Sequence, residues 1–193
     1  MTARLRDKRI EFYLEHRDDI REWAAIEKDV ARAVRSLLSE SQADLEVRLR
    51  ELDSAATTTR LDNGKYERIM LRRSSWPVEL GVTLEWEKTV DPFGGSLPKI
   101  GVFFVTKAPG ESRLREAVLE RCRQTGGLAA LGYKIGPESV WPAMRRVEKS
   151  RDWWRDPDQW VGDITSDVIA LWEKAAPAVE AALGAATEQS PGP

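Results

Sequence analysis

Apolar residues recur at three- and four-residue steps across residues 4–40, and charged residues fill most positions between them. This spacing predicts an amphipathic helix, in one piece or two. Asp18 or Asp19 could cap a second helix after His16, so a kink or short break is expected there. A stripe of this length must be buried against the rest of the domain or against a second chain. Its members are Ile10, Tyr13, Leu14, Ile20, Trp23, Ala24, Ile26, Val30, Val34, Leu37 and Leu38.

The next two segments carry weaker patterns. In residues 42–54, Leu45, Leu49 and Leu52 suit a helix, whereas Leu45, Val47 and Leu49 alternate as in a strand. The Glu and Arg residues between them favour the helix. Residues 54–64 are polar, and we expect a connection that ends in a turn at Asn63-Gly64.

The apolar period changes to two in the middle of the chain. Residues 76–88 alternate between apolar and polar side chains, which predicts a half-buried strand. Residues 66–73 before it and 100–106 after it predict two further strands, the second one central because both its faces are apolar. Residues 65–107 are therefore expected to form an antiparallel meander of about three strands. The apolar face of the middle strand would be Val78, Leu80, Val82, Leu84 and Trp86.

The C-terminal part returns to helical spacing. Helices are predicted at 112–124 and at 157–186, the second with Asp156 as N-cap and Pro157 in its first turn. Residues 131–150 can add one short strand, and 187–193 read as a frayed tail. The predicted architecture is a single α+β domain over residues 1–186, with a helical segment at 1–40. Its small, mostly antiparallel sheet of about three to four strands would pack against long N- and C-terminal helices and one middle helix.

Composition excludes several chemistries. The chain has 193 residues with a formal net charge of −2, one cysteine and one histidine. A disulfide within the chain and a thiolate zinc site are therefore excluded. His16 lies in a charged helical stretch and Cys122 on an apolar helix face, so neither predicts nucleophilic catalysis. Neither glycine-rich segment has the order of a phosphate loop, and no cofactor is predicted. Without a signal peptide or a membrane-spanning segment, we expect a cytoplasmic protein with no membrane partner.

Carboxylates offer the one enzymatic alternative. Glu79, Glu85 and Glu87 share one face of the middle strand and could help to hold a divalent metal. The order of elements over residues 18–135 resembles the core of the PD-(D/E)XK nucleases. That resemblance implies a metal-dependent nuclease with these three glutamates and Lys107 as catalytic residues. Its motif is not met, because Lys88 directly follows Glu87 and points the other way. We expect instead that this acidic face is the solvent-exposed side of an antiparallel sheet.

Tryptophan supplies the main signal for binding. Trp160 and Trp172 fall on the apolar face of the last helix and are expected in the core. Trp153 and Trp154 are adjacent, so at most one of them can be fully buried, and the other is a candidate contact residue. Arg145, Arg146 and Arg151 lie around them in a stretch of local positive charge, residues 145–155.

Two kinds of partner fit this stretch. Tryptophan-rich surface suits a protein partner or self-association, and basic residues interleaved with aromatics suit nucleic acid. With no catalytic constellation in view, we predict a non-catalytic binding or regulatory domain that acts through protein–protein interaction. The binding residues of that hypothesis are Arg145, Arg146, Arg151, Trp153 and Trp154, with nucleic acid as a second partner class.

Overall fold

The computed structural model describes residues 7–88, 97–105, 111–148 and 155–188. Two helices, α1 (Lys8–Glu15) and α2 (Arg17–Leu52), come first. Four strands follow: β1 (Ala56–Asp62), β2 (Tyr66–Arg73), β3 (Leu80–Glu87) and β4 (Lys99–Phe104). The C-terminal part contains α3 (Glu111–Gln124), α4 (Gly126–Ala130), β5 (Lys134–Glu138), β6 (Trp141–Arg146) and α5 (Pro157–Glu188).

The described strands form one antiparallel sheet in the order β1-β2-β3-β4-β6-β5. This is an α+β fold, as predicted, and β2, β3 and β4 form the expected meander. The predicted number of about three to four strands is wrong, because the sheet has six. The missed strands β1 and β5 lie at the two edges, where most side chains are solvated and the apolar alternation is weak. The threonines of β1 favour a strand by propensity, and an edge strand tolerates Pro137 in β5.

The N-terminal helices follow the predicted pattern. His16 separates α1 from α2, and α2 then runs for 36 residues without interruption. The helical assignment of residues 42–54 is confirmed up to Leu52. Neither Asp18 nor Asp19 is the N-cap, however, since both lie within the first turn of α2. None of the described helices combines the length and the apolarity needed to span a bilayer.

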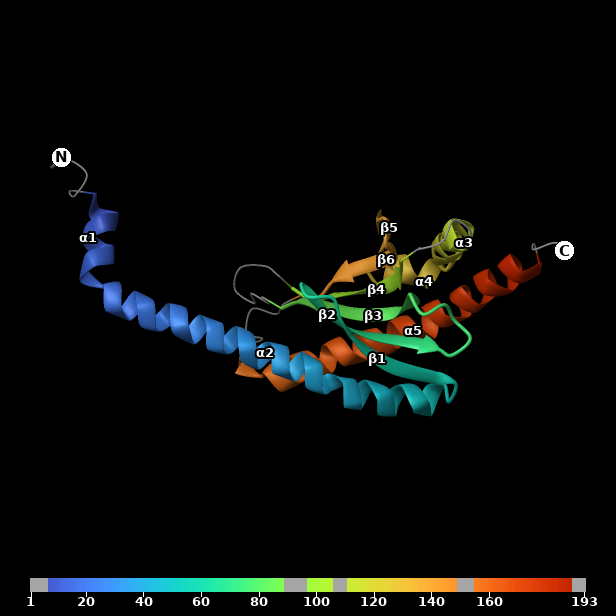
Figure 1. Ribbon diagram of the computed structural model, residues 1–193, viewed down its shortest axis with the longest axis horizontal. Coiled ribbons are helices and arrows are strands. Elements are labelled where there is room, and N and C mark those ends of the chain that lie inside the picture. The colour runs from blue at the N-terminus through green and yellow to red at the C-terminus, as the bar shows by residue number, and fades with distance from the viewer. Residues whose placement is uncertain (1–6, 89–96, 106–110, 149–154, 189–193) are drawn as a thin grey trace.

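The helices α2 and α5 cover one face of the sheet, and the main core lies between them and the strands (Figure 1). From α2, the apolar residues Val34, Leu38, Leu45 and Leu49 enter this core. Together with Ser41 they step along one side of the helix by three or four residues. The body of the protein, meaning the sheet with α3, α4, α5 and the second half of α2, is built around this layer.

The last helix begins as predicted. The backbone N–H of Gln159 donates to Oδ1 of Asp156 at 2.9 Å, so Asp156 is the N-cap and Pro157 stands in the first turn. Trp160 and Trp172 are 6% and 3% exposed, which confirms both as core residues. The helix continues to Glu188, so the first two residues of the predicted tail are helical.

The opposite face of the sheet points away from α2 and α5. There, Met70, Phe103, Trp141 and Met144 form a second, smaller apolar cluster. As a result, every residue of β3 except Glu87 is buried. The expectation of a half-buried strand is therefore wrong for β3. Val78, predicted on its apolar face, is 64% exposed because the strand begins only at Leu80.

Candidate functional site

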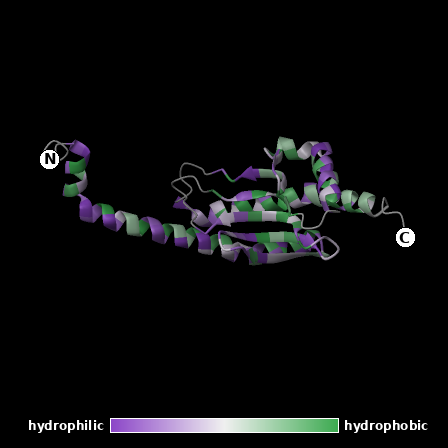
Figure 2. Ribbon diagram, turned by 45° about the horizontal axis from the view of Figure 1, so that its top comes forward, coloured by the Kyte–Doolittle hydropathy of each residue, from purple (hydrophilic) through white to green (hydrophobic). Residues whose placement is uncertain are grey.

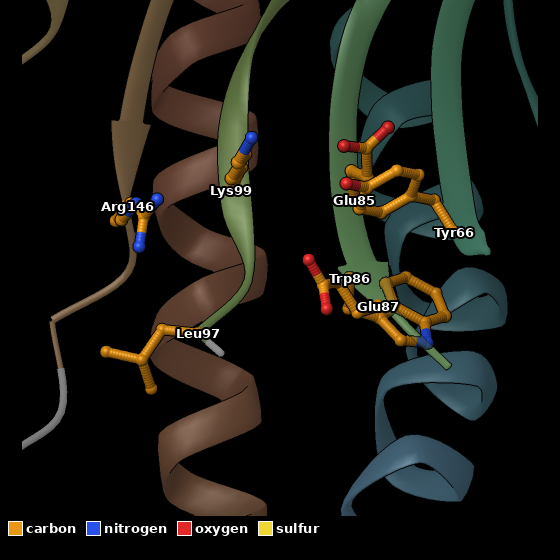
Figure 3. A pocket seen from close by; sticks show the side chains of 7 residues that line it. All are labelled: Tyr66, Glu85, Trp86, Glu87, Leu97, Lys99 and Arg146. Atoms are coloured by element: carbon orange, nitrogen blue, oxygen red, sulfur yellow. The ribbon is translucent and has the colours of Figure 1, made fainter. Parts of the chain in front are cut away.

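The glutamates of β3 lie on the sheet face that points away from α2 and α5. Leu84 and Ile100 face the helices in the main core, so Glu85 and Lys99, each one position away, face the other side (Figure 3). Glu85 is only 4% exposed and forms an ion pair with Arg68, with 2.6 Å between Arg68 Nη2 and Glu85 Oε2. The prediction that this acidic face is in bulk water is wrong for Glu85.

The cause is the strand register. Arg68 of β2, Glu85 of β3, Lys99 of β4 and Arg146 of β6 stand in one row across four strands. Arg68 also lies over the ring of Phe103, with 4.2 Å from its guanidinium carbon to the ring centroid. Burial raises the pKa of the Glu85 carboxyl, while Arg68 and Lys99 act in the opposite direction. The carboxylate therefore belongs to a cross-strand ion pair rather than to an open acidic surface.

The other two glutamates do not join Glu85 in a site. Glu87 is partly exposed, with Lys65 Nζ at 3.9 Å, and Glu79 precedes the first residue of β3. Within the described ranges, no three His, Cys, Asp or Glu residues are grouped so that they could hold a metal. The pocket beside Glu85 has a volume of about 40 Å³, far below the roughly 300–1,000 Å³ of small-molecule sites. Lys107 lies outside the described residues, and the nuclease hypothesis stays a prediction.

The basic stretch at 145–155 divides between the two faces of the sheet. Arg145 turns toward the helices, where it pairs with Asp167 of α5 and lies over the ring of Tyr133. Arg146 is exposed on the opposite face, so these two arginines do not present one surface. Arg151, Trp153 and Trp154 lie outside the described residues. The binding role predicted for this stretch stays a prediction.

A groove of about 670 Å³ adjoins Arg146. Lys134 and Arg146 are exposed along it, and Leu131 and Met144 add apolar surface. The nearby rings on this sheet face, Phe103 and Trp141, are buried against each other in an edge-to-face contact. They cannot serve as the stacking platform that single-stranded nucleic acids require.

A larger exposed feature is the helical arm, which we define as α1 together with residues 17–33 of α2. It projects from the body at the N-terminal end (blue in Figure 1). No residue of α1 is buried, and the first buried residue of α2 is Val34. Apolar and polar residues alternate along the arm in Figure 2. Five large apolar side chains are between 47% and 59% exposed: Phe12, Tyr13, Leu14, Trp23 and Ile26.

The exposed stripe of the arm is continuous with the buried stripe of the body. Ile20, Trp23 and Val30 lead along one side of the helix into Val34 and Leu38. Trp23 is exposed, whereas Ile20 and Val30 are half-buried, and Val30 already packs against the main core. They therefore occupy the side of α2 that farther along packs against the sheet and α5. The amphipathic helix predicted from the sequence is real, but the protein's own body buries only the C-terminal part of its apolar stripe.

The apolar side of residues 17–33 is flanked by α1 and by the body. After the break at His16, α1 turns to the same side of α2 as the body, in both Figure 1 and Figure 2. The apolar side of residues 17–33 is thus bounded by α1 at one end and by the body at the other. A rise of 1.5 Å per residue makes this stretch roughly 25 Å long, comparable with several turns of a second helix.

No family model, curated protein or solved structure matches the chain. Contiguous exposed apolar patches of more than a few hundred Å² mark interaction sites on most folded proteins. The helical arm exposes five large apolar side chains along its two helices. The length of the apolar stripe had left two possible covers, the rest of the domain or a second chain, and the described body covers only its C-terminal part.

Proposed function

We propose that this protein is a non-catalytic binding protein that acts through protein–protein interaction, with the helical arm as its docking surface. The observation that carries the proposal is the exposure of Trp23, Ile26 and the aromatic residues of α1 on a helical arm that the described body of the chain does not cover. An amphipathic helix is stabilised mainly by burying its apolar face, so this arm is expected to be covered in the working state.

The exposed rings of the arm give the main free-energy gain of binding. An aromatic side chain buries about 150–250 Å² when it is fully covered. With about half of that still open at Phe12, Tyr13 and Trp23, roughly 300 Å² of aromatic surface per arm can leave water. At about 25 cal/mol per Å² this corresponds to a gross gain of about 7 kcal/mol, which offsets a large part of the roughly 4–15 kcal/mol that association costs.

The ionisable groups of the body support a binding role over a catalytic one. Glu85 is paired with Arg68, and Arg73 is held between Asp53 and Glu180. Burial raises the pKa of the Cys122 thiol to about 12, so it stays protonated at neutral pH. These contacts connect strands and helices to each other and leave the groups engaged in structure.

Photo-crosslinking in cells tests the proposal. A benzoyl-phenylalanine at position 23 replaces one aromatic ring with another on the exposed stripe. The control is the same residue at position 25, because Ala25 is exposed on the opposite side of the helix. We expect a crosslinked protein adduct from position 23 and none from position 25. Absence of an adduct at position 23, or equal adducts at both positions, would reject the arm as a docking surface.

A further inference from the structure

We infer that the partner of the helical arm is a second copy of this chain, with the two arms packed antiparallel about a two-fold axis at the height of Ala25 along the helix. This inference rests on the proposed docking function and adds the identity of the partner. Exposed apolar side chains alone do not select a partner. Three features of the arm favour a second copy as the partner. They are the order of the apolar residues along its stripe, the single carboxylate of Glu27 within that stripe, and the near balance of the charges on its outer side.

The layer order makes the stripe self-complementary. Within the continuous helix of the arm, the central positions are Ile20, Trp23, Glu27 and Val30, at alternating steps of three and four. This is the spacing at which two helices interdigitate their side chains. In an antiparallel pair centred at the height of Ala25, Ile20 lies against the partner's Val30, at the place where Val30 begins to pack against its own core. Trp23 lies against the partner's Glu27, and the same two layers repeat on the other side of the axis.

Glu27 determines the orientation. In a parallel pair of arms, Glu27 of each copy would face Glu27 of the other in the middle of the apolar layers. Two carboxylates at that position repel each other and lose hydration. In the antiparallel pair each Glu27 instead lies beside an indole, whose N–H edge is polar and can donate to a carboxylate. A single polar residue in the seam commonly fixes register and orientation in this way.

The flanks of the stripe favour close approach. Ala24 and Ala31 border one side of the stripe, and Ile26 and Ala33 border the other. In the antiparallel register Ala24 meets Ala24 of the second copy, and Ile26 meets the partner's Ile26. Small side chains at these places let two helices lie close together and bring more apolar surface into contact. None of these four positions carries a charge that a different partner would have to neutralise.

The charges of the arm nearly balance, since residues 17–33 carry four basic and five acidic side chains, and two pairs on its outer side form within the chain. Arg32 pairs with Asp29 at 2.8 Å, and Arg21 lies 3.6 Å from Asp18. These pairs span three residues along the helix, so they need no contribution from a partner. A strongly acidic or basic partner would therefore gain little here, whereas a second identical arm presents the same apolar seam.

The area involved sets the expected strength. Of the five exposed apolar side chains, only Trp23 and Ile26 lie in this seam, so two arms bury less than the roughly 1,000 Å² of a stable specific interface and form a weak one. We therefore expect a closed two-fold dimer that dissociates in the micromolar range.

The test is sedimentation velocity of the full chain between about 1 and about 200 µM, a range that brackets micromolar dissociation constants. We expect a concentration-dependent dimer, with Trp23→Glu weakening dimerisation by about 100-fold, as for an interface hot spot. Ala25→Glu, on the outer side of the helix, is the matched control and should leave the dimer unchanged. Because both positions are exposed, circular dichroism should show unaltered folding for both variants.

Single-cysteine crosslinking tests the orientation, since Cys122 is buried. Oxidation should join two Ala24→Cys chains, and it should fail for Ile20→Cys, whose positions are about 15 Å apart along the axis in the antiparallel pair. Efficient crosslinking of Ile20→Cys would overturn the antiparallel arrangement. A chain that stays monomeric at the highest concentration would overturn the inference of a second copy. The docking function would then still stand if position 23 crosslinks to a different protein in cells, and would fail with it if no adduct forms.

Discussion

Gly101 of β4 lies opposite Met144 of β6, and replacing it with alanine probes how tightly the sheet is packed on the face that points away from α2 and α5. A Cβ atom at this position would stand 2.2 Å from the carbonyl oxygen of Ala143 and 3.0 Å from Cα of Met144. It would also lie 2.9 Å from Cε3 of Trp141, a side chain that is fully buried. Two of these three atoms belong to the backbone, so the clash cannot be relieved by rotating a side chain.

The expected cost follows from that geometry. Adding one carbon to a well-packed interior typically destabilises by about 1–3 kcal/mol, and the backbone contacts here place Gly101→Ala at about 3 kcal/mol. For a chain of this size, that corresponds to a fall in Tm of roughly 6–12 °C. A domain with a total stability of about 5–15 kcal/mol stays folded after such a loss, so the effect can be measured.

Urea unfolding followed by tryptophan fluorescence measures this loss, with Gly162→Ala as the control. Gly162 lies in α5 with an ordinary helical backbone, and a Cβ atom added there would meet no neighbouring atom within 4 Å. Alanine at this position should stabilise the protein by about 0.5–1 kcal/mol. The packing argument is refuted if Gly101→Ala lies within about 0.5 kcal/mol of the wild-type free energy of unfolding, the range of ordinary surface substitutions.

Four further outcomes are expected. Cys122, whose pKa burial raises to about 12, should react with a thiol reagent only as fast as the protein unfolds, and rapid labelling under native conditions would contradict this. Asp156→Ala should lose about 1 kcal/mol of stability in thermal denaturation, because α5 loses its cap. Since the pKa of Glu85 is raised, its contribution to stability is present at low pH and is lost as pH rises through the folded-state pKa. Glu85→Gln should therefore gain stability relative to wild type as the pH of urea unfolding is raised from about 4 to about 7, and the reverse trend would mean that Arg68 outweighs burial. Glu27→Leu should tighten the dimer in sedimentation experiments while relaxing its orientation, which Ile20→Cys crosslinking would reveal.

Local patterns predicted the elements that are half or fully apolar. The meander β2–β4 and the helices α2, α3 and α5 follow from the spacing of apolar residues, because burial on one side leaves a period in the sequence. β1 was missed because an edge strand made of Thr57, Thr58 and Thr59 has little to bury. Residues 131–150 were expected to add one short strand and contain two, because the edge strand β5 has equally little to bury and includes Gly136 and Pro137, which are typical of turns.

The sites were harder to predict than the elements because they depend on registers between distant segments. Alternation placed Glu85 on the correct face of its strand. It could not show that Arg68 and Lys99 stand directly opposite in the neighbouring strands and remove the carboxylate from water. Likewise, the stripe through Trp23 indicated a surface that needs covering. Whether the body or a partner covers it depends on where the body ends along α2, and no pattern within the helix encodes that position.

α2 runs without a break from Arg17 to Leu52, so residues 17–33 of the arm and the part of α2 that packs on the sheet form one continuous helix. A change in the number of residues in this helix therefore rotates one end relative to the other about the helix axis. Inserting two residues near position 33 would rotate everything upstream by roughly 200°, and inserting seven would rotate it by about 20° short of two full turns. Any assembly formed through the arm should tolerate the longer insertion far better than the shorter one. The length of α2 thus sets both the distance of the arm from the body and the direction in which its apolar side faces.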